Sequence, residues 1–290
     1  MTARIFVGDA LTRLAELPHG SVKTCVTSPP YWGLRDYGHE GQMGLEPTPD
    51  EYVANMVRLF REVRRVLSDD GTLWLNLGDT YASGKQLVGI PWRVAFALQA
   101  DGWWLSQDII WHKPNPMPES VTDRCTKAHE YLFLLSKSAR YFYNARAISD
   151  PVTPQSRERS AYGYNTTERD TGTQAAQIGA RRRQRMGLRE TYQLSETRNK
   201  RSVWTVGVKP YSGAHFAVMP ADLVEPCIMA GSSPDDLVLD PFTGSGTVGM
   251  VALRHGRRFV GIELNPEYAA LAESRIYEDG PLLNQVEVVV

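Results

Sequence analysis

Two stretches of this sequence combine residue types that could act on a planar ligand carrying an amine. The first is Thr27–Trp32, in which two prolines separate a small hydroxyl residue from two aromatic rings. Proline fixes φ and has no N–H, so Pro29 and Pro30 should end a strand and leave its carbonyl groups free to accept hydrogen bonds. Tyr31 and Trp32 add flat apolar surfaces beside those acceptors, which suits a nucleobase. Alone, the stretch also fits a proline-terminated strand followed by core aromatic residues.

The second stretch, near the other end of the chain, has the spacing of a ligand-binding turn. Gly244, Gly246 and Gly249 follow the pattern G-x-G-x-x-G between an apolar run and a helical pattern, where glycine lets a ligand approach the backbone. Glu263 ends the next apolar run, and its carboxylate could accept both hydroxyls of a ribose. Asp240 precedes the turn, and its charge favours a ligand with an ammonium group over a pyrophosphate. On spacing alone, a nicotinamide dinucleotide and an oxidoreductase remain an alternative.

The elements around these stretches alternate between helical and strand patterns. Such alternation predicts an α/β fold with a mostly parallel, Rossmann-like sheet and helices on both faces. Parallel strands present their carboxyl ends to one crevice, so residues far apart in sequence can meet there. A helix from Pro49 should end at Ser68–Gly71. We expect strands at Arg4–Val7, Val22–Thr27, Thr72–Leu77, Trp104–His112, Tyr131–Leu135, Tyr141–Tyr143, Leu237–Leu239 and Phe259–Ile262, and further helices at Ala10–Glu16, Pro91–Gln99, Pro220–Ala230, Thr247–Arg254 and from Pro266.

Charge is unevenly distributed along the chain. The 290 residues are enough for one large α/β domain with an insertion, and the net charge of −1 excludes a uniformly cationic protein. Between Ser156 and Arg201, however, eleven Lys and Arg residues face five Asp and Glu residues. This polar segment has no clear hydrophobic period, which indicates an insertion with a local basic surface.

Cysteine usage and hydropathy exclude several other classes. The three cysteines, Cys25, Cys125 and Cys227, form no C-x-x-C pair, so we expect neither a zinc site nor a disulfide framework, and no metal. Cys25 lies within a predicted strand, where a core thiol fits better than the nucleophile of 5-methylcytosine chemistry. No apolar run is long enough to span a membrane, and the amino terminus lacks the apolar core of a signal peptide. We therefore expect a cytoplasmic protein.

Taken together, Thr27–Tyr31 and Asp240–Thr247 resemble motifs of the β-class amino-group DNA methyltransferases. In that family a catalytic (D/N/S)-P-P-(Y/F/W) motif precedes the target-recognition region, and the S-adenosylmethionine motif comes last. The resemblance covers nearly the whole chain except the basic insertion. It implies a circularly permuted class I methyltransferase fold, with residues 1–150 as the catalytic half, 151–202 as the target-recognition insertion and 203–290 as the cofactor-binding half.

The resemblance also implies a reaction. The exocyclic amine of cytosine or adenine is a poor nucleophile, because its lone pair is delocalised into the ring. Ser28 and the Pro29 carbonyl would accept its two hydrogens while Tyr31 stacks on the ring, so that the nitrogen attacks the sulfonium methyl of S-adenosylmethionine directly. The target base must be flipped out of the duplex. Family members with serine at the first motif position mostly modify cytosine N4, so Ser28 favours that product over N6-methyladenine, which stays open.

The family pattern assigns roles to individual residues and partners. Apart from the family pattern, the position of His129 and Glu130 before a predicted strand fits either a surface pair or a pocket edge, and we favour the surface. Double-stranded DNA is the expected partner, and a homodimer and a cognate restriction endonuclease are allowed. A non-catalytic DNA-binding module is a further alternative, although it would not need both motifs. The expected catalytic residues are Ser28, Pro29, Pro30 and Tyr31; the cofactor-binding residues are Asp9, Ala10, His215, Phe216, Asp240, Pro241, Phe242, Gly244, Ser245, Gly246, Thr247, Glu263 and Asn265; and the DNA-binding residues are Lys113, Arg181, Arg182, Arg183 and Arg185.

Overall fold

The chain forms two compact units in a computed structural model. The structure describes residues 1–39, 41–82, 85–153, 196–208 and 218–290. The larger unit combines Met1–Ile148 with Arg201–Val290, and the smaller unit is Ser149–Lys200. In its described part, the smaller unit contains a short antiparallel ladder between β6 (Asp150–Pro151) and β7 (Thr197–Arg198). Its role in target recognition stays a prediction.

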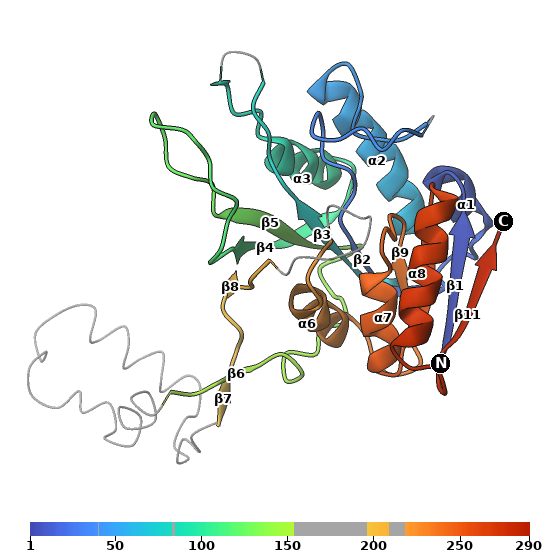
Figure 1. Ribbon diagram of the computed structural model, residues 1–290. Helices are drawn as coiled ribbons and strands as arrows, with labels where there is room; N and C mark the ends of the chain where they lie inside the picture. The colour runs from blue at the N-terminus through green and yellow to red at the C-terminus, as the bar shows by residue number, and fades with distance from the viewer. Residues whose placement is uncertain (40, 83–84, 154–195, 209–217) are drawn as a thin grey trace, which may run out of the picture. The chain divides into compact units, whose positions relative to one another are not determined.

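A nine-stranded sheet is the centre of the larger unit (Figure 1). The strand order is β11-β1-β10-β9-β2-β3-β5-β4-β8, and only the pairs that include β5 are antiparallel. The predicted mostly parallel sheet is therefore confirmed. The strands are β1 (Thr2–Val7), β2 (Val22–Thr27), β3 (Leu67–Leu77), β4 (Trp104–His112), β5 (His129–Ser136), β8 (Val203–Thr205), β9 (Leu237–Asp240), β10 (Arg258–Glu263) and β11 (Gln285–Val289).

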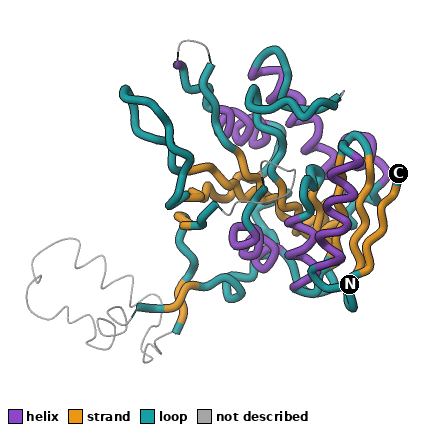
Figure 2. Tube along the Cα trace, viewed as in Figure 1, coloured by secondary structure: helices purple, strands orange, loops and turns teal. Residues whose placement is uncertain are grey.

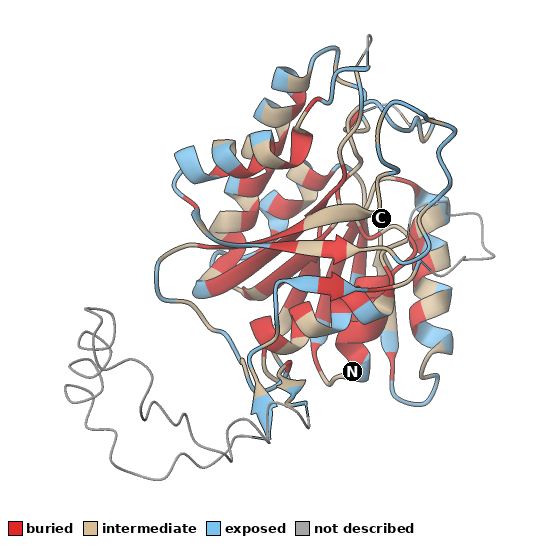
Figure 3. Cartoon of the chain, turned by 90° about the vertical axis from the view of Figure 1, so that its left-hand side faces the viewer, coloured by how far each residue is buried: buried red, intermediate tan, exposed pale blue. Residues whose placement is uncertain are grey.

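Helices cover both faces of this sheet, as the tube view shows (Figure 2). One apolar cluster joins α1, α2 and α3 to one face, and a second joins α6, α7 and α8 to the other. The central strands are consequently buried on both sides, whereas exposed residues lie on the outer surfaces of the helices (Figure 3). The helices are α1 (Ala10–Glu16), α2 (Pro49–Val66), α3 (Ile90–Ala100), α6 (Ala221–Gly231), α7 (Thr247–Arg254) and α8 (Pro266–Glu278).

Local sequence explains the longest of these helices. Thr48 caps α2 by accepting a hydrogen bond from the backbone N–H of Glu51 at 3.2 Å, and Pro49 occupies the first turn, where its missing N–H costs nothing. Tyr52, Met56 and Phe60 recur at helical spacing and are fully buried. This buried face holds α2 against β2 and β3, the strands that lead to the site.

The order of strands brings the two motif-bearing segments together. β2 and β9 are neighbours at the middle of the sheet, with Cys25 opposite Leu239 in parallel register. β10 lies next to β9 on one side of this pair, and β3 lies next to β2 on the other side. Ligands of open α/β sheets bind beyond the carboxyl ends of strands at such a point. The segments that follow β2 and β9 are the proline stretch and the glycine turn.

Three expectations about local structure were wrong or incomplete. Ser68–Gly71 does not end a helix before the strand but is the extended start of β3, because Leu67 already pairs with Val22. Tyr141–Tyr143 is a loop rather than a strand; the Phe142 N–H donates to Asp70 O, and the Tyr143 ring stacks near Trp74. The edge strand β11 was not predicted.

No helix among the residues that the structure describes combines the length and apolar character required to cross a bilayer.

Candidate active site

A cavity of about 560 Å³ opens beyond the carboxyl ends of the central strands. Its wall includes Ser28–Tyr31 from the proline stretch and Asp240–Ser245 from the glycine turn, which are more than 200 residues apart in sequence. Asn76 and Gly78, at the end of β3, complete the middle of the wall. This volume lies in the ordinary range for small-molecule sites. The two stretches thus share one cavity.

A direct hydrogen bond joins the two stretches. The Thr27 hydroxyl donates to Asp240 Oδ1 at 2.7 Å, and the Phe242 N–H donates to the same oxygen at 3.0 Å. Asp240 is 2% exposed, and this burial, with a smaller contribution from the charge of Glu263, raises the pKa of its carboxyl to about 7, against the two hydrogen bonds, which lower it. No described residue donates to the Asp240 Oδ2 atom. A cationic ligand beside this carboxyl would stabilise its charged form.

Backbone geometry shapes the glycine turn. Gly244 and Gly246 have φ of 50° and 78°, in the left-handed region where other residues are strained. A Cβ on Gly246 would lie 2.9 Å from the Ala272 Cβ, so the turn packs directly on α8. The Thr243 N–H donates to Ile262 O at 2.9 Å, which ties the turn to β10. These contacts hold the backbone open toward the cavity.

Glu263 supports the turn from the end of β10. Its Oε2 accepts the Gly244 N–H at 2.7 Å and its Oε1 accepts the Asn265 N–H at 3.0 Å. Burial raises the pKa of this carboxyl, and the two N–H groups partly oppose the shift. Nearby, Asp9 caps α1 by accepting from the Thr12 N–H at 2.9 Å. Glu263 and Asp9 are two of the carboxylates that line the cavity.

The proline stretch is held mainly by side chains. The Tyr52 hydroxyl donates to the Pro30 carbonyl at 2.9 Å, so one of the two carbonyl groups expected to be free is already bonded. No described residue donates to the Pro29 carbonyl. The Tyr31 ring lies over Gly78, where a Cβ would approach Tyr31 Cε2 to 2.4 Å. Gly78 therefore leaves the space that the aromatic ring occupies.

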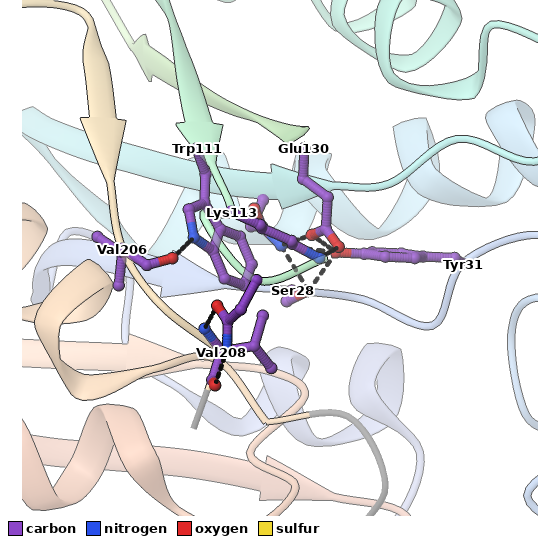
Figure 4. A network of polar contacts seen from close by, with 9 residues as sticks. Ser28, Tyr31, Trp111, Lys113, Glu130, Val206 and Val208 are labelled. Atoms are coloured by element: carbon purple, nitrogen blue, oxygen red, sulfur yellow. Dashed lines mark hydrogen bonds and ion pairs between the residues drawn. The ribbon is translucent and has the colours of Figure 1, made fainter. Parts of the chain in front are cut away.

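A polar network surrounds the Tyr31 hydroxyl (Figure 4). Tyr31 Oη donates to Glu130 Oε2 at 2.7 Å, and the Ser28 hydroxyl donates to Tyr31 Oη at 3.3 Å. The Asn76 amide donates to Tyr31 Oη at 2.6 Å, to Glu130 Oε2 at 2.9 Å and to Ser28 Oγ at 3.3 Å. Lys113 Nζ pairs with Glu130 Oε1. Burial and the charge of Glu130 raise the pKa of Tyr31 well above its ordinary value, so the phenol keeps its proton.

The segment after β4 forms the outer side of this network. Lys113 Nζ lies 4.4 Å from the centroid of the Trp111 ring, and Trp111 Nε1 donates to Val206 O at 2.9 Å. The Asn115 side chain makes two hydrogen bonds of 3.0 Å with the backbone of Val208 (Figure 4). β4 and the segment after β8 are thereby joined beside the cavity.

Comparison with known proteins identifies the family. The N6/N4 DNA methylase family model matches residues 22–274, a span that includes both motifs. This chain belongs to that family. Among curated family relatives, it is 47% identical to the type II methyltransferase M.XycI of Xanthomonas campestris pv. cyanopsidis, over 94% of this chain and 87% of the relative. It is 45% identical to the type II methyltransferase M.Cfr9I of Citrobacter freundii, over 94% and 87%.

Solved structures of two DNA methylases share the fold. A DNA modification methylase of Thermus thermophilus, described as putative and complexed with S-adenosyl-L-methionine, has a TM-score of 0.66 at 27% identity and covers 99% of this chain and 98% of its own. The cytosine-N4-specific PvuII DNA methyltransferase has a TM-score of 0.69 at 20% identity, over 99% and 95%. The predicted class I methyltransferase fold is confirmed.

Most of the predicted site residues of this family member meet in the cavity, although their individual roles stay predictions. Gly246 is not part of the wall and instead packs on α8. His215, Phe216 and the four arginines Arg181, Arg182, Arg183 and Arg185 lie outside the described residues. The predicted residues that line the cavity are Asp9, Ala10, Ser28, Pro29, Pro30, Tyr31, Lys113, Asp240, Pro241, Phe242, Gly244, Ser245, Thr247, Glu263 and Asn265.

Of three further residues, Glu130 and Asn76 depart from the expectations and Cys25 agrees with them. Glu130 is at the pocket edge, not in the favoured surface pair, with its side chain 15% exposed. Asn76 was missed, although a lone amide within the apolar run Thr72–Leu77 was a usable signal because buried polar groups need partners. Cys25 is fully buried in β2, and burial raises its pKa well above the ordinary value, which fits a core thiol.

Proposed function

We propose that this protein transfers a methyl group from S-adenosylmethionine to the N4 amine of a cytosine flipped out of double-stranded DNA. The observation that carries the proposal is the single cavity shared by Ser28–Tyr31 and Asp240–Ser245, which are joined through Thr27 and Asp240. Membership of the N6/N4 DNA methylase family limits the chemistry to an exocyclic amine. N6-methylation of adenine is the alternative within this class.

The cofactor half of the cavity fits a ligand that carries both a positive charge and hydroxyl groups. When bound, S-adenosylmethionine supplies an electrophilic sulfonium methyl group. Asp240 offers a buried carboxyl oxygen to the ligand's ammonium group, and Glu263 and Asp9 offer carboxylates to hydroxyl or ring N–H groups. The left-handed backbone at Gly244 allows the ligand to lie against the turn. A pyrophosphate would be repelled here, so a nicotinamide dinucleotide fits poorly.

The base half of the cavity fits an aromatic ring with an amine. The Tyr31 ring provides a stacking surface, and the Pro29 carbonyl and Ser28 hydroxyl provide acceptors for the two amine hydrogens. Accepting those hydrogens draws the nitrogen lone pair away from the ring and toward the methyl group. Ser28 is a neutral hydroxyl residue, whereas adenine-specific members of the β-class amino-group methyltransferases mostly carry an acidic or amide residue at this position. The serine therefore supports cytosine as the target base.

The product distinguishes the proposed activities. DNA incubated with the protein and S-adenosylmethionine would be digested to nucleosides and analysed by mass spectrometry. We expect N4-methylcytosine; N6-methyladenine without N4-methylcytosine would overturn the choice of base but not the class. DNA retention without any methyl transfer would instead identify a non-catalytic binding module.

Contact with DNA phosphates is proposed for the basic segment and for the region around Lys113. Phosphate contacts set affinity and register without reading sequence. Replacing Arg181, Arg182, Arg183 and Arg185 together by alanine should weaken DNA binding and reduce the slope of log affinity against log salt. A homodimer, a cognate restriction endonuclease and a cytoplasmic location are compatible proposals, and type II methyltransferases are among its relatives.

A further inference from the structure

We propose that Glu130 is a positioning residue that makes the Ser28 hydroxyl an acceptor toward the target amine. The inference rests on the proposed function, because it requires an exocyclic amine beside Ser28. Its basis is a continuous chain of hydrogen bonds from Glu130 through Tyr31 to Ser28, in which each group has a fixed number of donors and acceptors (Figure 4).

The carboxylate end of the chain can only accept. Glu130 Oε1 pairs with the Lys113 ammonium, and Oε2 accepts from Tyr31 Oη at 2.7 Å and from the Asn76 amide at 2.9 Å. The side chains of Glu130 and Lys113 are 15% and 19% exposed, so water screens this pair weakly. The ammonium has only donors, so Oε1 accepts from it, and a carboxylate has no proton to donate.

The direction of the Tyr31 hydroxyl follows from that end. A phenol has one proton, and it is used on Glu130. Tyr31 Oη must therefore accept from its two remaining neighbours, the Asn76 amide at 2.6 Å and the Ser28 hydroxyl at 3.3 Å. The orientation of the Asn76 amide agrees with these directions. Its NH₂ group faces Ser28 Oγ, Tyr31 Oη and Glu130 Oε2, whereas the reverse orientation would place the amide oxygen against the same three oxygen atoms.

Ser28 then has one lone pair left for a ligand. Its proton is used on Tyr31. One lone pair faces the Asn76 NH₂ group at 3.3 Å and can only share one of its two hydrogens, because the shorter contacts to Tyr31 Oη and Glu130 Oε2 already use both. The second lone pair remains on an oxygen that lines the cavity. An amine hydrogen needs such an acceptor, whereas a hydroxyl proton directed into the cavity would oppose it. The charge on Glu130 thus determines whether the Ser28 hydroxyl presents a lone pair or its proton to the base.

The variant Glu130→Gln tests this with almost no change in shape. The Lys113 ammonium attracts the glutamine oxygen and directs the new NH₂ group toward Tyr31, which reverses the chain and turns the Ser28 proton toward the cavity. Single-turnover methylation with radiolabelled S-adenosylmethionine should slow by about tenfold to a hundredfold, the effect of one or two charge-assisted hydrogen bonds. Affinities for S-adenosylmethionine and for DNA should stay within about twofold of wild type on the same argument, because neither contact is removed.

Glu278→Gln is the matched control, because Glu278 is exposed at the end of α8 and does not line the cavity. It makes the same substitution and removes the same charge, and it should keep the wild-type rate. A wild-type rate in Glu130→Gln, or an equal loss in both variants, would overturn the proposal.

A double-mutant cycle separates this role from simple loss of structure. In a Ser28→Ala background the hydroxyl is absent, so adding Glu130→Gln should change the transfer rate by less than about twofold. An undiminished effect of Glu130→Gln in that background would show that Glu130 does not act through Ser28.

A second variant covers the case in which Glu130→Gln does not fold. Tyr31→Phe removes one atom from the chain and keeps the stacking ring, and it should slow transfer by about tenfold without weakening cofactor binding. An unchanged rate would refute the chain. Failure of the proposed function can be told apart from failure of this inference, because the wild-type protein would then form no methylated base. If the product is N6-methyladenine, the same comparison of variants applies to adenine.

Discussion

The two sides of the cavity are built in different ways. The Asp240–Gly246 turn is shaped by its own backbone, through left-handed glycines and N–H groups that donate to Glu263 and to β10. The Ser28–Tyr31 stretch is instead held by side chains from other elements, with Tyr52 from α2, Asn76 from β3 and Glu130 from β5. A turn defined by backbone should tolerate distant changes, whereas the proline stretch should respond to substitutions at several sites far from it in sequence.

The largest expected effect is on the turn side. Asp240→Asn keeps an oxygen for the Thr27 and Phe242 donors but removes the charge offered to the ligand, so S-adenosylmethionine affinity should fall by about a hundredfold or more. Isothermal titration calorimetry measures this, with the exposed Asp235→Asn in the same region as the control. Unchanged affinity would mean that Asp240 does not face the cationic part of the cofactor.

The same variant should not cost stability. Folding raises the pKa of Asp240 from 3.8 to about 7, so the folded state favours the protonated carboxyl. That favourable contribution is complete below about pH 4 and is lost as pH rises toward 7. Asparagine avoids the buried charge, and cofactor-free Asp240→Asn should therefore melt above wild type at pH 8 and close to it at pH 4. A lower melting temperature at both pH values would contradict this account of Asp240.

The second effect, on the proline stretch, should appear in the rate rather than in cofactor affinity. Gly78→Ala places a Cβ 2.4 Å from the Tyr31 ring, which must move. We expect methyl transfer to slow by about tenfold to a hundredfold, as a misplaced reacting group does. Gly207→Ala is the control, since its Cβ would meet its nearest neighbour at 3.5 Å. Equal losses of rate and of cofactor affinity in Gly78→Ala would show that the two sides are not separable.

A third expected effect is on pH dependence, which should also distinguish the sides. Below pH 7 the empty site holds Asp240 protonated, and binding a cation must release that proton. Cofactor affinity should fall by up to about tenfold for each pH unit below 7. Calorimetry at pH 6 in two buffers of different ionisation enthalpy would reveal the released proton, and Asp240→Asn should abolish the signal.

The smallest expected effect is at the Pro30 carbonyl. Tyr52→Phe removes the donor at 2.9 Å and should destabilise the protein by about 1 kcal/mol. The rate should fall only a few-fold, because Pro30 is one residue removed from the carbonyl that accepts the amine hydrogen. Denaturant unfolding and the transfer rate, measured together, test whether α2 supports the proline stretch. A rate loss as large as that of Gly78→Ala would assign Pro30 a direct role.

Sequence reasoning succeeded where the information is local. Glycine spacing, the acid at the end of β10 and the prolines after β2 identify strand ends and turns by chain geometry, so both motifs could be assigned to one crevice of a parallel sheet. It failed where partners are distant. The Asn76 and Glu130 contacts depend on β5 pairing antiparallel beside β3, and nothing in the residues around either position specifies that neighbour. The extended start of β3 was missed for the same reason, because its partner is Val22.

The position of β9 and β10 between β1 and β2 has a consequence for synthesis of the chain. A ribosome releases β1 and β2 more than 200 residues before the two strands that must insert between them. The centre of the sheet cannot close before β9 and β10 have been synthesised, so β1 and β2 lack these neighbours until then, and contacts of such long range form slowly. A prematurely terminated product that lacks β9 contains the Ser28–Tyr31 stretch but has no partner for Thr27, and it should have no methyltransferase activity.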